Sequence, residues 1–264
     1  MKKSLLFLIY LSFCLGACDQ TPPLQTLTLQ FKTSHEKQSV NCESGDVSLT
    51  DLRFYIHAIE LLDTNGQATP MVLHEDGQQQ TDNVVLLDFE NGQGVCRNGS
   101  AETYTTITSD VPAGSYQGLR FRIGVPFELN HQNPVQAKPP LNYSTMHWHW
   151  QAGYKFMRFG VKSGESSFWF HLGSTGCQGS VTHVTGCERG NRPMVEFNTF
   201  DTLQDHIIID MATMLQSVDI SQHSKCMSSP ESSSCIGVFE VLGLDMETGE
   251  PVQSAPLFKR GKRP

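Results

Sequence analysis

The chain has 264 residues, of which 19 are Lys or Arg and 27 are Asp or Glu, giving a formal net charge of -8 at pH 7. This acidic balance argues against a nucleic-acid partner, because binding to the phosphate backbone requires clustered positive charge. After the N-terminal segment, no stretch of sequence is long and apolar enough to cross a bilayer as a helix. The length suffices for one large β domain or two small ones.

The N-terminal residues 1–17 are typical of a signal peptide. Two lysines precede an apolar run that is too short to span a membrane as a helix. The run ends in Leu-Gly-Ala followed by Cys18, which resembles a bacterial lipobox, in which Cys18 becomes the lipidated first residue of the mature protein. We therefore expect an exported lipoprotein, periplasmic or on the cell surface of a Gram-negative bacterium, anchored to the membrane by lipid, with residues 18–26 as a short tether. A soluble secreted product cleaved nearby is the alternative.

Six cysteines lie beyond this segment, an even number in an exported chain: Cys42, Cys96, Cys177, Cys187, Cys226 and Cys235. Outside the cytoplasm such a set normally forms disulfides, although sequence alone cannot choose between the possible connectivities. Spacing favours the local pairs Cys177 with Cys187 and Cys226 with Cys235, and this leaves Cys42 with Cys96. A cysteine-rich zinc site is the competing interpretation, but no C-x-x-C spacing occurs.

About ten short segments have the alternating or continuously apolar character of β-strands. They are residues 27–32, 49–62, 84–89, 104–108, 119–125, 154–161, 167–172, 192–197, 206–210 and 236–244, with one or two helical turns at 210–215. Frequent Gly, Pro and Asn turns separate them. The pattern predicts an all-β fold, a single antiparallel β-sandwich that is immunoglobulin-like or a flattened barrel with long disulfide-pinned loops, over residues 27–258. The basic ending, residues 259–264, is interpreted as a solvated tail.

The run Met146-His147-Trp148-His149-Trp150 brings together two histidines, two of the three tryptophans and a methionine. If the run is extended, alternation places His147 and His149 on one face and Met146, Trp148 and Trp150 on the other. Two imidazoles on one face can bind one metal ion, and imidazole with a thioether suits copper better than magnesium or calcium. The alternative is that the tryptophans fill a core while the histidines lie on a wet surface.

Two further histidines lie on predicted strands. His57 is on a mostly apolar strand face, where a lone histidine is more often a hydrogen-bonded core residue than a ligand. His171 directly precedes Gly-Ser-Thr-Gly-Cys177, where a turn fixed by a disulfide could hold its imidazole in place. The proline-rich connection over residues 126–142 leads into the aromatic run, and long loops in compact domains tend to be functional.

Together these motifs resemble the MbnP-like family of exported copper-binding proteins, also described as metallo-mystery-pair four-Cys proteins. The resemblance is carried by residues 48–61 (SLTDLRFYIHAIEL), 146–156 (MHWHWQAGYKF) and 170–177 (FHLGSTGC), and by the four cysteines Cys177, Cys187, Cys226 and Cys235. It extends from about residue 27 to about residue 258. The motifs are specific only in combination.

The resemblance implies a β-sandwich with a copper site and a partner, a di-haem enzyme related to bacterial cytochrome c peroxidases (MbnH-like). In the family, this partner oxidises a tryptophan to kynurenine beside His-ligated copper. Trp148 and Trp150 match the W-x-W of the motif, and one of them is the candidate for oxidation. His57 and His171 match motif histidines, whereas the ligand roles of His147 and His149 rest on their spacing. We expect His57, His171 and one or both of His147 and His149 to bind one copper ion.

This interpretation makes the chain a metal carrier and an enzyme's substrate rather than an enzyme. No nucleophile elbow, H-E-x-x-H, phosphate-binding loop, dinucleotide fingerprint or C-x-x-C-H haem site is present. The alternative is a metal-free, disulfide-stapled β-sandwich that binds a protein or glycan through exposed aromatic residues. A third possibility, that the copper-loaded chain is itself an oxidase or peroxidase, lacks a recognisable acid/base pair.

Overall fold

The computed structural model describes residues 22–34, 42–43, 45–81, 83–96, 100–221 and 224–263. The expected signal peptide, the candidate lipidation site Cys18 and the first part of the tether lie outside these residues. Within the described ranges, none of the helices has the length and apolar character needed to cross a membrane.

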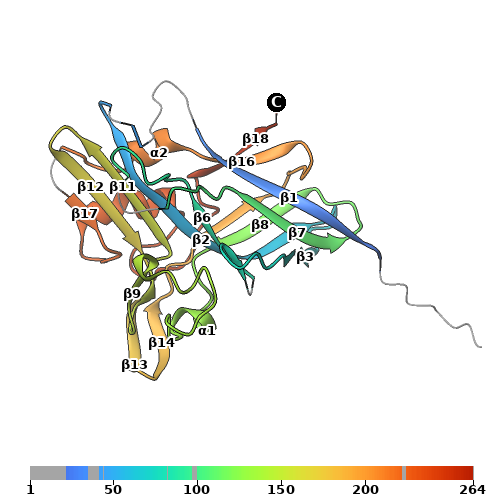
Figure 1. The fold of residues 1–264 in the computed structure, drawn as a ribbon, viewed down its shortest axis with the longest axis horizontal. Coiled ribbons are helices and arrows are strands. Elements are labelled where there is room, and N and C mark those ends of the chain that lie inside the picture. Colours follow the sequence, from blue (N-terminus) through green and yellow to red (C-terminus); the bar gives the residue numbers. More distant parts are fainter. Residues whose placement is uncertain are drawn as a thin grey trace, which may run out of the picture.

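Two main sheets form the body of the molecule (Figure 1). Among the described residues, the larger sheet has nine strands, in the order β15-β8-β2-β11-β12-β17, with β3 and β6 also paired to β2 and β5 paired to β6. These strands are β2 (Ser48–Leu62), β3 (Ala68–Pro70), β5 (Gln80–Thr81), β6 (Val84–Asp88), β8 (Gly118–Ile123), β11 (Met157–Ser163), β12 (Ser166–Leu172), β15 (Met194–Phe197) and β17 (Ser224–Cys226). The second sheet, in the order β18-β16-β1-β7-β4, contains β1 (Leu24–Thr33), β4 (Val72–Leu73), β7 (Thr106–Pro112), β16 (Asp205–Ile209) and β18 (Phe258–Lys262).

Two small hairpins and several short helices complete the described chain. The hairpins pair β9 (His147–His149) with β10 (Gly153–Tyr154), and β13 (Thr175–Ser180) with β14 (His183–Arg189). The helices are α1 (Phe127–Asn130), α2 (Met211–Gln216) and α3 (Ile236–Val241), with 3-10 turns η1 (Ser144–Met146) and η2 (Ser233–Cys235). In Figure 1, β9, the β13–β14 hairpin and α1 project together from one side of the sheets.

The two sheets pack face to face through a group of phenylalanines. Phe31 of β1 contacts Phe121 of β8 edge-on, with ring centroids 5.8 Å apart. Phe258 of β18 lies 5.9 Å from Phe121 and 5.7 Å from Phe54 of β2. All four rings are buried, so apolar side chains from both sheets fill one core. The predicted all-β sandwich is confirmed, and the described sheets are open, which decides against the flattened barrel.

Two features of the topology depart from the sequence prediction. Most strand pairs are antiparallel, but β1 pairs with β16 and β12 pairs with β17 in parallel. Residues 236–244, predicted as a strand, contain α3 instead. Its buried side chains, Val238 and Phe239, are followed by buried Leu242, so the apolar positions suit a helix face as well as a strand. A short apolar run does not distinguish these two cases by period alone.

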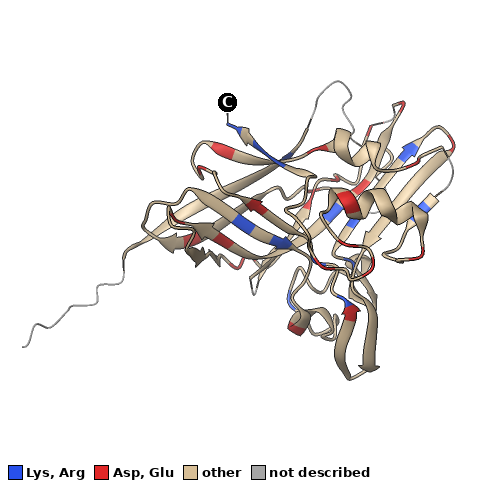
Figure 2. Ribbon diagram, turned by 180° about the vertical axis from the view of Figure 1, so that it is seen from behind, with Lys and Arg blue, Asp and Glu red and all other residues tan. Residues whose placement is uncertain are grey.

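The basic C-terminal segment is not a solvated tail. Residues 258–262 form β18, which pairs antiparallel with β16 and is the blue stretch near the C-terminus in Figure 2. Lys262 Nζ lies 2.7 Å from Asp205 Oδ1, and Lys259 forms an ion pair with Asp210. Buried Phe258 starts the strand. The positive charges are therefore placed on an edge strand opposite acidic partners.

The structure contains three disulfides in the pairing that spacing favours: Cys42–Cys96, Cys177–Cys187 and Cys226–Cys235. Cys177 and Cys187 are direct partners in the β13–β14 hairpin, a segment that the sequence suggested only as a loop. Cys226 ends β17 and Cys235 ends η2, immediately before α3. This last bond therefore joins an edge strand of the large sheet to the 3-10 turn that leads into α3.

A buried carboxylate with two arginines links the neighbouring strands β2 and β11 of the large sheet. Asp51 of β2 forms ion pairs with Arg53 at 2.8 Å and with Arg158 of β11 at 2.7 Å. In the backbone register of β11 and β12, Arg158 lies directly opposite His171. Asp51 is 1% exposed, so its removal would leave two guanidinium groups without their shared counter-ion.

We predict that Asp51→Asn lowers the free energy of unfolding by about 3–5 kcal/mol, the usual cost of removing one partner from a buried ion pair. Urea unfolding of the two proteins measures this difference. The control is Glu75→Gln, which breaks the exposed ion pair with Lys138 and should cost less than about 1 kcal/mol. Equal effects of the two substitutions would show that Asp51 is not needed to balance the arginines.

Candidate metal centre

The aromatic run forms a short strand and a tight turn rather than a long extended segment. β9 covers only His147–His149, and its pairing with β10 encloses a turn at residues 150–152. Gly153 has φ +77°, and a Cβ there would lie 2.2 Å from the carbonyl oxygen of Asn130. Glycine thus permits both the turn and the close packing against the residue before His131.

This turn separates the two tryptophans that the sequence placed on one face. Trp148 lies on β9, whereas Trp150 lies in the turn and is 37% exposed. Met146 does not add a thioether to the site, because it ends the 3-10 turn η1 and is fully buried in the core. The predicted alternation does not describe this run, because His149 lines a hollow together with Trp148 whereas His147 and Trp150 line another.

Trp148 contacts the imidazole of His171. The two ring centroids are 5.9 Å apart and the planes lie at 86°, an edge-to-face arrangement. Gly173 makes room for the indole, since a Cβ at this position would lie 3.1 Å from Trp148 Cζ3. The structure thus brings together two residues that are distant in the sequence but were both candidates for the site.

The imidazole of His171 is neutral at pH 7, and one of its ring nitrogens lacks a hydrogen-bond partner in the described structure. Burial, followed by the positive charges of Arg158 and Lys155, lowers the pKa of His171 to about 4. Its Nε2 is buried and has no hydrogen-bond partner among the described residues. A neutral imidazole nitrogen is the form that binds metals. An unsatisfied buried nitrogen requires an explanation, and a ligand role supplies one.

Two hydrogen bonds to the Thr145 carbonyl oxygen help to position the aromatic run relative to His171. Arg158 Nη1 donates to the carbonyl oxygen of Thr145 at 2.9 Å, and Lys155 Nζ donates to the same oxygen at 3.0 Å. Arg158 also pairs with Asp51 and lies opposite His171 in the sheet, so the start of the aromatic run is bonded to β11, the strand next to the one that carries His171.

A hollow of about 390 Å³, the Trp148 hollow, adjoins this contact. Its lining includes Trp148, His149 and Met227, with residues 174–177 along one side. Met227 follows Cys226 and was not identified from the sequence; its only signal was its place beside a disulfide. Its thioether gives the hollow the soft ligand that Met146 does not provide.

His147 points to a different hollow, of about 840 Å³, the His131 hollow. His131, His147 and Trp150 all line it. The ring of His147 lies 5.3 Å from that of Tyr154, and burial, with the nearby His149, Lys155 and His131, lowers the pKa of His147. His131 was not singled out in the sequence, although the proline-rich connection that contains it was expected to be functional.

His57 is not brought to the other histidines. Its Nδ1 lies 2.9 Å from the carbonyl oxygen of Gly124, and it lines a third hollow with Arg122 and Arg192. Burial lowers the pKa of His57 to about 4, with a further contribution from these two arginines. Among the described residues, no three of the expected histidines His57, His147, His149 and His171 have ring nitrogens within 4.8 Å of one another.

Searches against known proteins place the chain in a family. A family model described as MbnP matches residues 24–228. The chain belongs to the MbnP family. A solved structure, MbnP from Methylosinus trichosporium, superimposes with a TM-score of 0.79 at 27% sequence identity, covering 91% of this chain and 99% of that one. A search of curated proteins finds no match. The MbnP family match includes β9, His171 and Met227, so the Trp148 hollow lies inside the matched region.

Proposed function

We propose that this chain is an exported copper-binding protein whose metal site forms around His171 and Trp148. Membership of the MbnP family supports a copper-associated, non-catalytic role. The observation that carries the site is the buried Nε2 of His171, which lacks a hydrogen-bond partner in the described structure and belongs to a ring in contact with Trp148.

The residues around the Trp148 hollow fit a soft metal ion. His171 supplies a neutral imidazole, and His149 lines the hollow with the Met227 thioether. Imidazole and thioether ligands suit copper, whereas carboxylates suit magnesium or calcium. No Asp or Glu lines this hollow among the described residues. In this proposal His171 and His149 bind the copper, His147 lines the separate His131 hollow and is not a ligand, and His57 is a structural residue.

The proposal also assigns the tryptophan that a di-haem, cytochrome c peroxidase-like partner (MbnH-like) would oxidise to kynurenine. Trp148 is favoured over Trp150 because only Trp148 contacts His171, while Trp150 faces the His131 hollow. Opening the indole would give an aryl amine and a ketone, both able to approach a metal held by His171. The partner supplies the oxidising chemistry, and this chain supplies the position of the ring.

Export and anchoring form the last part of the proposal. Family membership supports an exported protein, and the lipobox-like sequence ending at Cys18 supports a lipid anchor on the periplasmic or outer surface. Cys18 itself lies outside the described residues. A single anchor at the N-terminus would leave the sandwich accessible to a soluble partner.

We predict that His171→Ala weakens copper binding by more than about tenfold, because even the loss of a group that only orients a metal ligand costs that much. Copper content and competition titration of tag-free protein, co-produced with the partner enzyme, measure the effect. The matched control is His74→Gln, because His74 Nε2 lies 2.8 Å from Asp110 Oδ2, away from the aromatic run. Wild-type protein without copper would instead support the metal-free binding protein.

We also predict that Trp148→Phe abolishes the modification. After co-production with the partner, peptide mass spectrometry of the wild type should show a gain of about 4 mass units, the signature of a tryptophan-to-kynurenine change. The gain should persist in Trp150→Phe. Modification that survives in Trp148→Phe and disappears in Trp150→Phe would assign the reaction to the other indole.

A further inference from the structure

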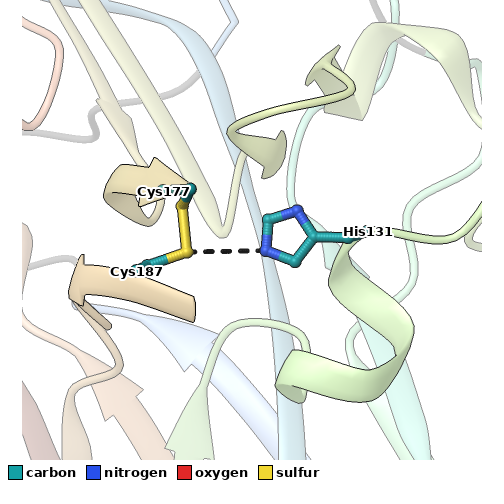
Figure 3. A group of neighbouring side chains, drawn as sticks. All are labelled: His131, Cys177 and Cys187. Atoms are coloured by element: carbon teal, nitrogen blue, oxygen red, sulfur yellow. Dashed lines mark hydrogen bonds between the residues drawn. A yellow bond between two sulfur atoms is a disulfide. The ribbon is translucent and has the colours of Figure 1, made fainter. Parts of the chain in front are cut away.

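The Cys177–Cys187 disulfide faces an imidazole from another part of the chain. His131, which follows α1, directs its Nε2 towards Cys187 Sγ at 3.5 Å (Figure 3). This nitrogen and both sulfur atoms lie within 4.8 Å of one another. Two sulfurs and one imidazole nitrogen at this spacing have the composition of a soft-metal site, except that the sulfurs are bonded to each other.

Hydrogen bonds set which nitrogen of His131 carries its proton. The Asn130 side chain accepts from the backbone N–H of Tyr154 through Oδ1 at 2.9 Å and donates to the Ala152 carbonyl through Nδ2 at 3.2 Å. This fixes its amide orientation, so Nδ2 also donates to His131 Nε2, at 3.1 Å. The proton of the neutral ring is then on Nδ1, 3.4 Å from the Trp150 carbonyl oxygen. The lone pair on Nε2 accepts the hydrogen bond from Asn130, and a metal ion bound at the sulfurs would have to replace that bond, while Asn130 kept its bond to the Ala152 carbonyl.

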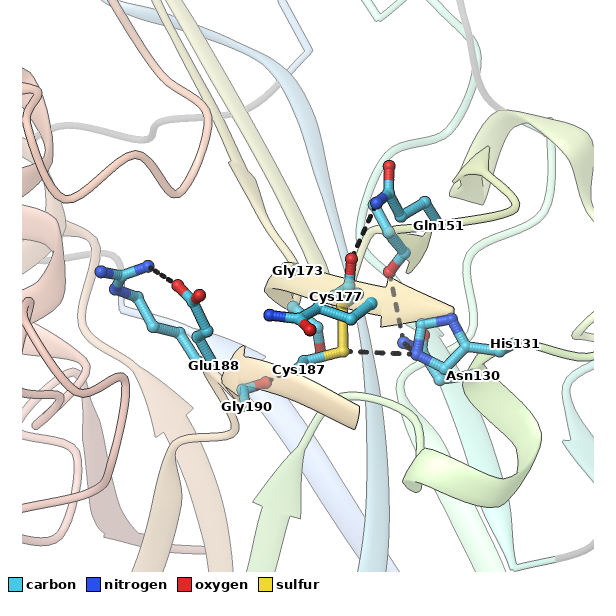
Figure 4. The surroundings of a disulfide bond; sticks show 12 residues. Asn130, His131, Gln151, Gly173, Cys177, Cys187, Glu188 and Gly190 are labelled. Carbon is cyan, nitrogen blue, oxygen red and sulfur yellow. Dashed lines mark hydrogen bonds and ion pairs between the residues drawn. A yellow bond between two sulfur atoms is a disulfide. The ribbon is translucent and has the colours of Figure 1, made fainter. Parts of the chain in front are cut away.

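The two cysteines would keep their relative position without the bond between them. They are direct cross-strand partners in the β13–β14 hairpin, so both side chains point to the same face. Gln151 Nε2 donates to the Cys177 carbonyl at 2.7 Å, which ties β13 to the turn after β9 (Figure 4). The hairpin ladder and this contact are independent of the sulfur–sulfur bond.

This disulfide is also the most accessible of the three. Cys187 is half-buried, whereas Cys96, Cys226 and Cys235 have no exposed surface and Cys42 is 6% exposed. A dithiol in solution attacks a disulfide at a reachable sulfur. It should therefore reach Cys187 before it reaches either of the other two bonds.

We propose that reduction of Cys177–Cys187 converts this group into a binding site for Cu(I), held by two thiolates and His131 Nε2. A dithiol reductant supplies two electrons and two protons, becomes a disulfide itself, and leaves two thiols on the hairpin. Binding of Cu(I) then releases the two thiol protons to solvent. Thiolates favour soft Cu(I) or zinc, and three protein ligands suit Cu(I) better because structural zinc nearly always takes four. This site does not depend on the Trp148 site.

The test uses the full mature chain carrying His149→Ala, His171→Ala and Trp148→Phe, which removes both proposed imidazole ligands and the tryptophan of the Trp148 site, so that the two proposals fail separately. The protein is treated anaerobically with dithiothreitol, freed of reductant by gel filtration, and titrated with Cu(I) against a chromogenic Cu(I) chelator. Alkylation and peptide mass spectrometry identify the reduced cysteines, and near-ultraviolet circular dichroism reports the fold.

We expect selective reduction of Cys177 and Cys187, an unchanged near-ultraviolet spectrum and about one equivalent of Cu(I) bound to the reduced chain only. Adding Cys177→Ser with Cys187→Ser should abolish this binding, and His131→Gln should weaken it by more than about tenfold. The proposal is overturned if the disulfide resists the dithiol in folded protein, if its reduction unfolds the chain, or if the reduced chain binds no more Cu(I) than the double serine variant.

Discussion

The contact between the Trp148 indole and the His171 imidazole is the interaction on which the proposed function depends. It joins β9, a three-residue strand in a projecting hairpin, to β12 in the large sheet. Glycine at position 173 allows the indole to approach. In the described structure one buried nitrogen of His171 has no hydrogen-bond partner, and a bound metal ion would give it one.

A buried ionic group of Asp51, Arg53 and Arg158 helps to position the segment that carries Trp148. Asp51 neutralises Arg53 and Arg158, and Arg158 holds the Thr145 carbonyl at the start of the aromatic run. An apolar side chain in place of Arg158 could fill the same volume. It could not donate a hydrogen bond to the Thr145 carbonyl, and it would carry no charge to lower the pKa of His171. The same arginine thus orients the run and, together with burial, which is the larger cause, lowers the pKa of His171 so that the imidazole stays neutral.

Much of the fold could be predicted from the sequence, but fewer of the residues around the candidate metal site could. Alternating strands with turn residues predict a sandwich, and cysteine spacing favoured the disulfides that the structure contains. Local patterns could not show that β9 ends after three residues, which separates Trp148 from Trp150. Nor could they place His131 and Met227, because those positions depend on contacts between distant segments. For His57, the caution that a lone strand histidine is usually hydrogen-bonded in a core agrees with its bond to Gly124.

The most direct test of the account is anomalous diffraction at the copper absorption edge from crystals of the copper-loaded protein, co-produced with its di-haem partner. The account predicts a copper peak within bonding distance of His171 Nε2, about 2 Å away, with the modified side chain of residue 148 beside it. A copper peak at His57, or a fully loaded protein with no copper near His171, would contradict it.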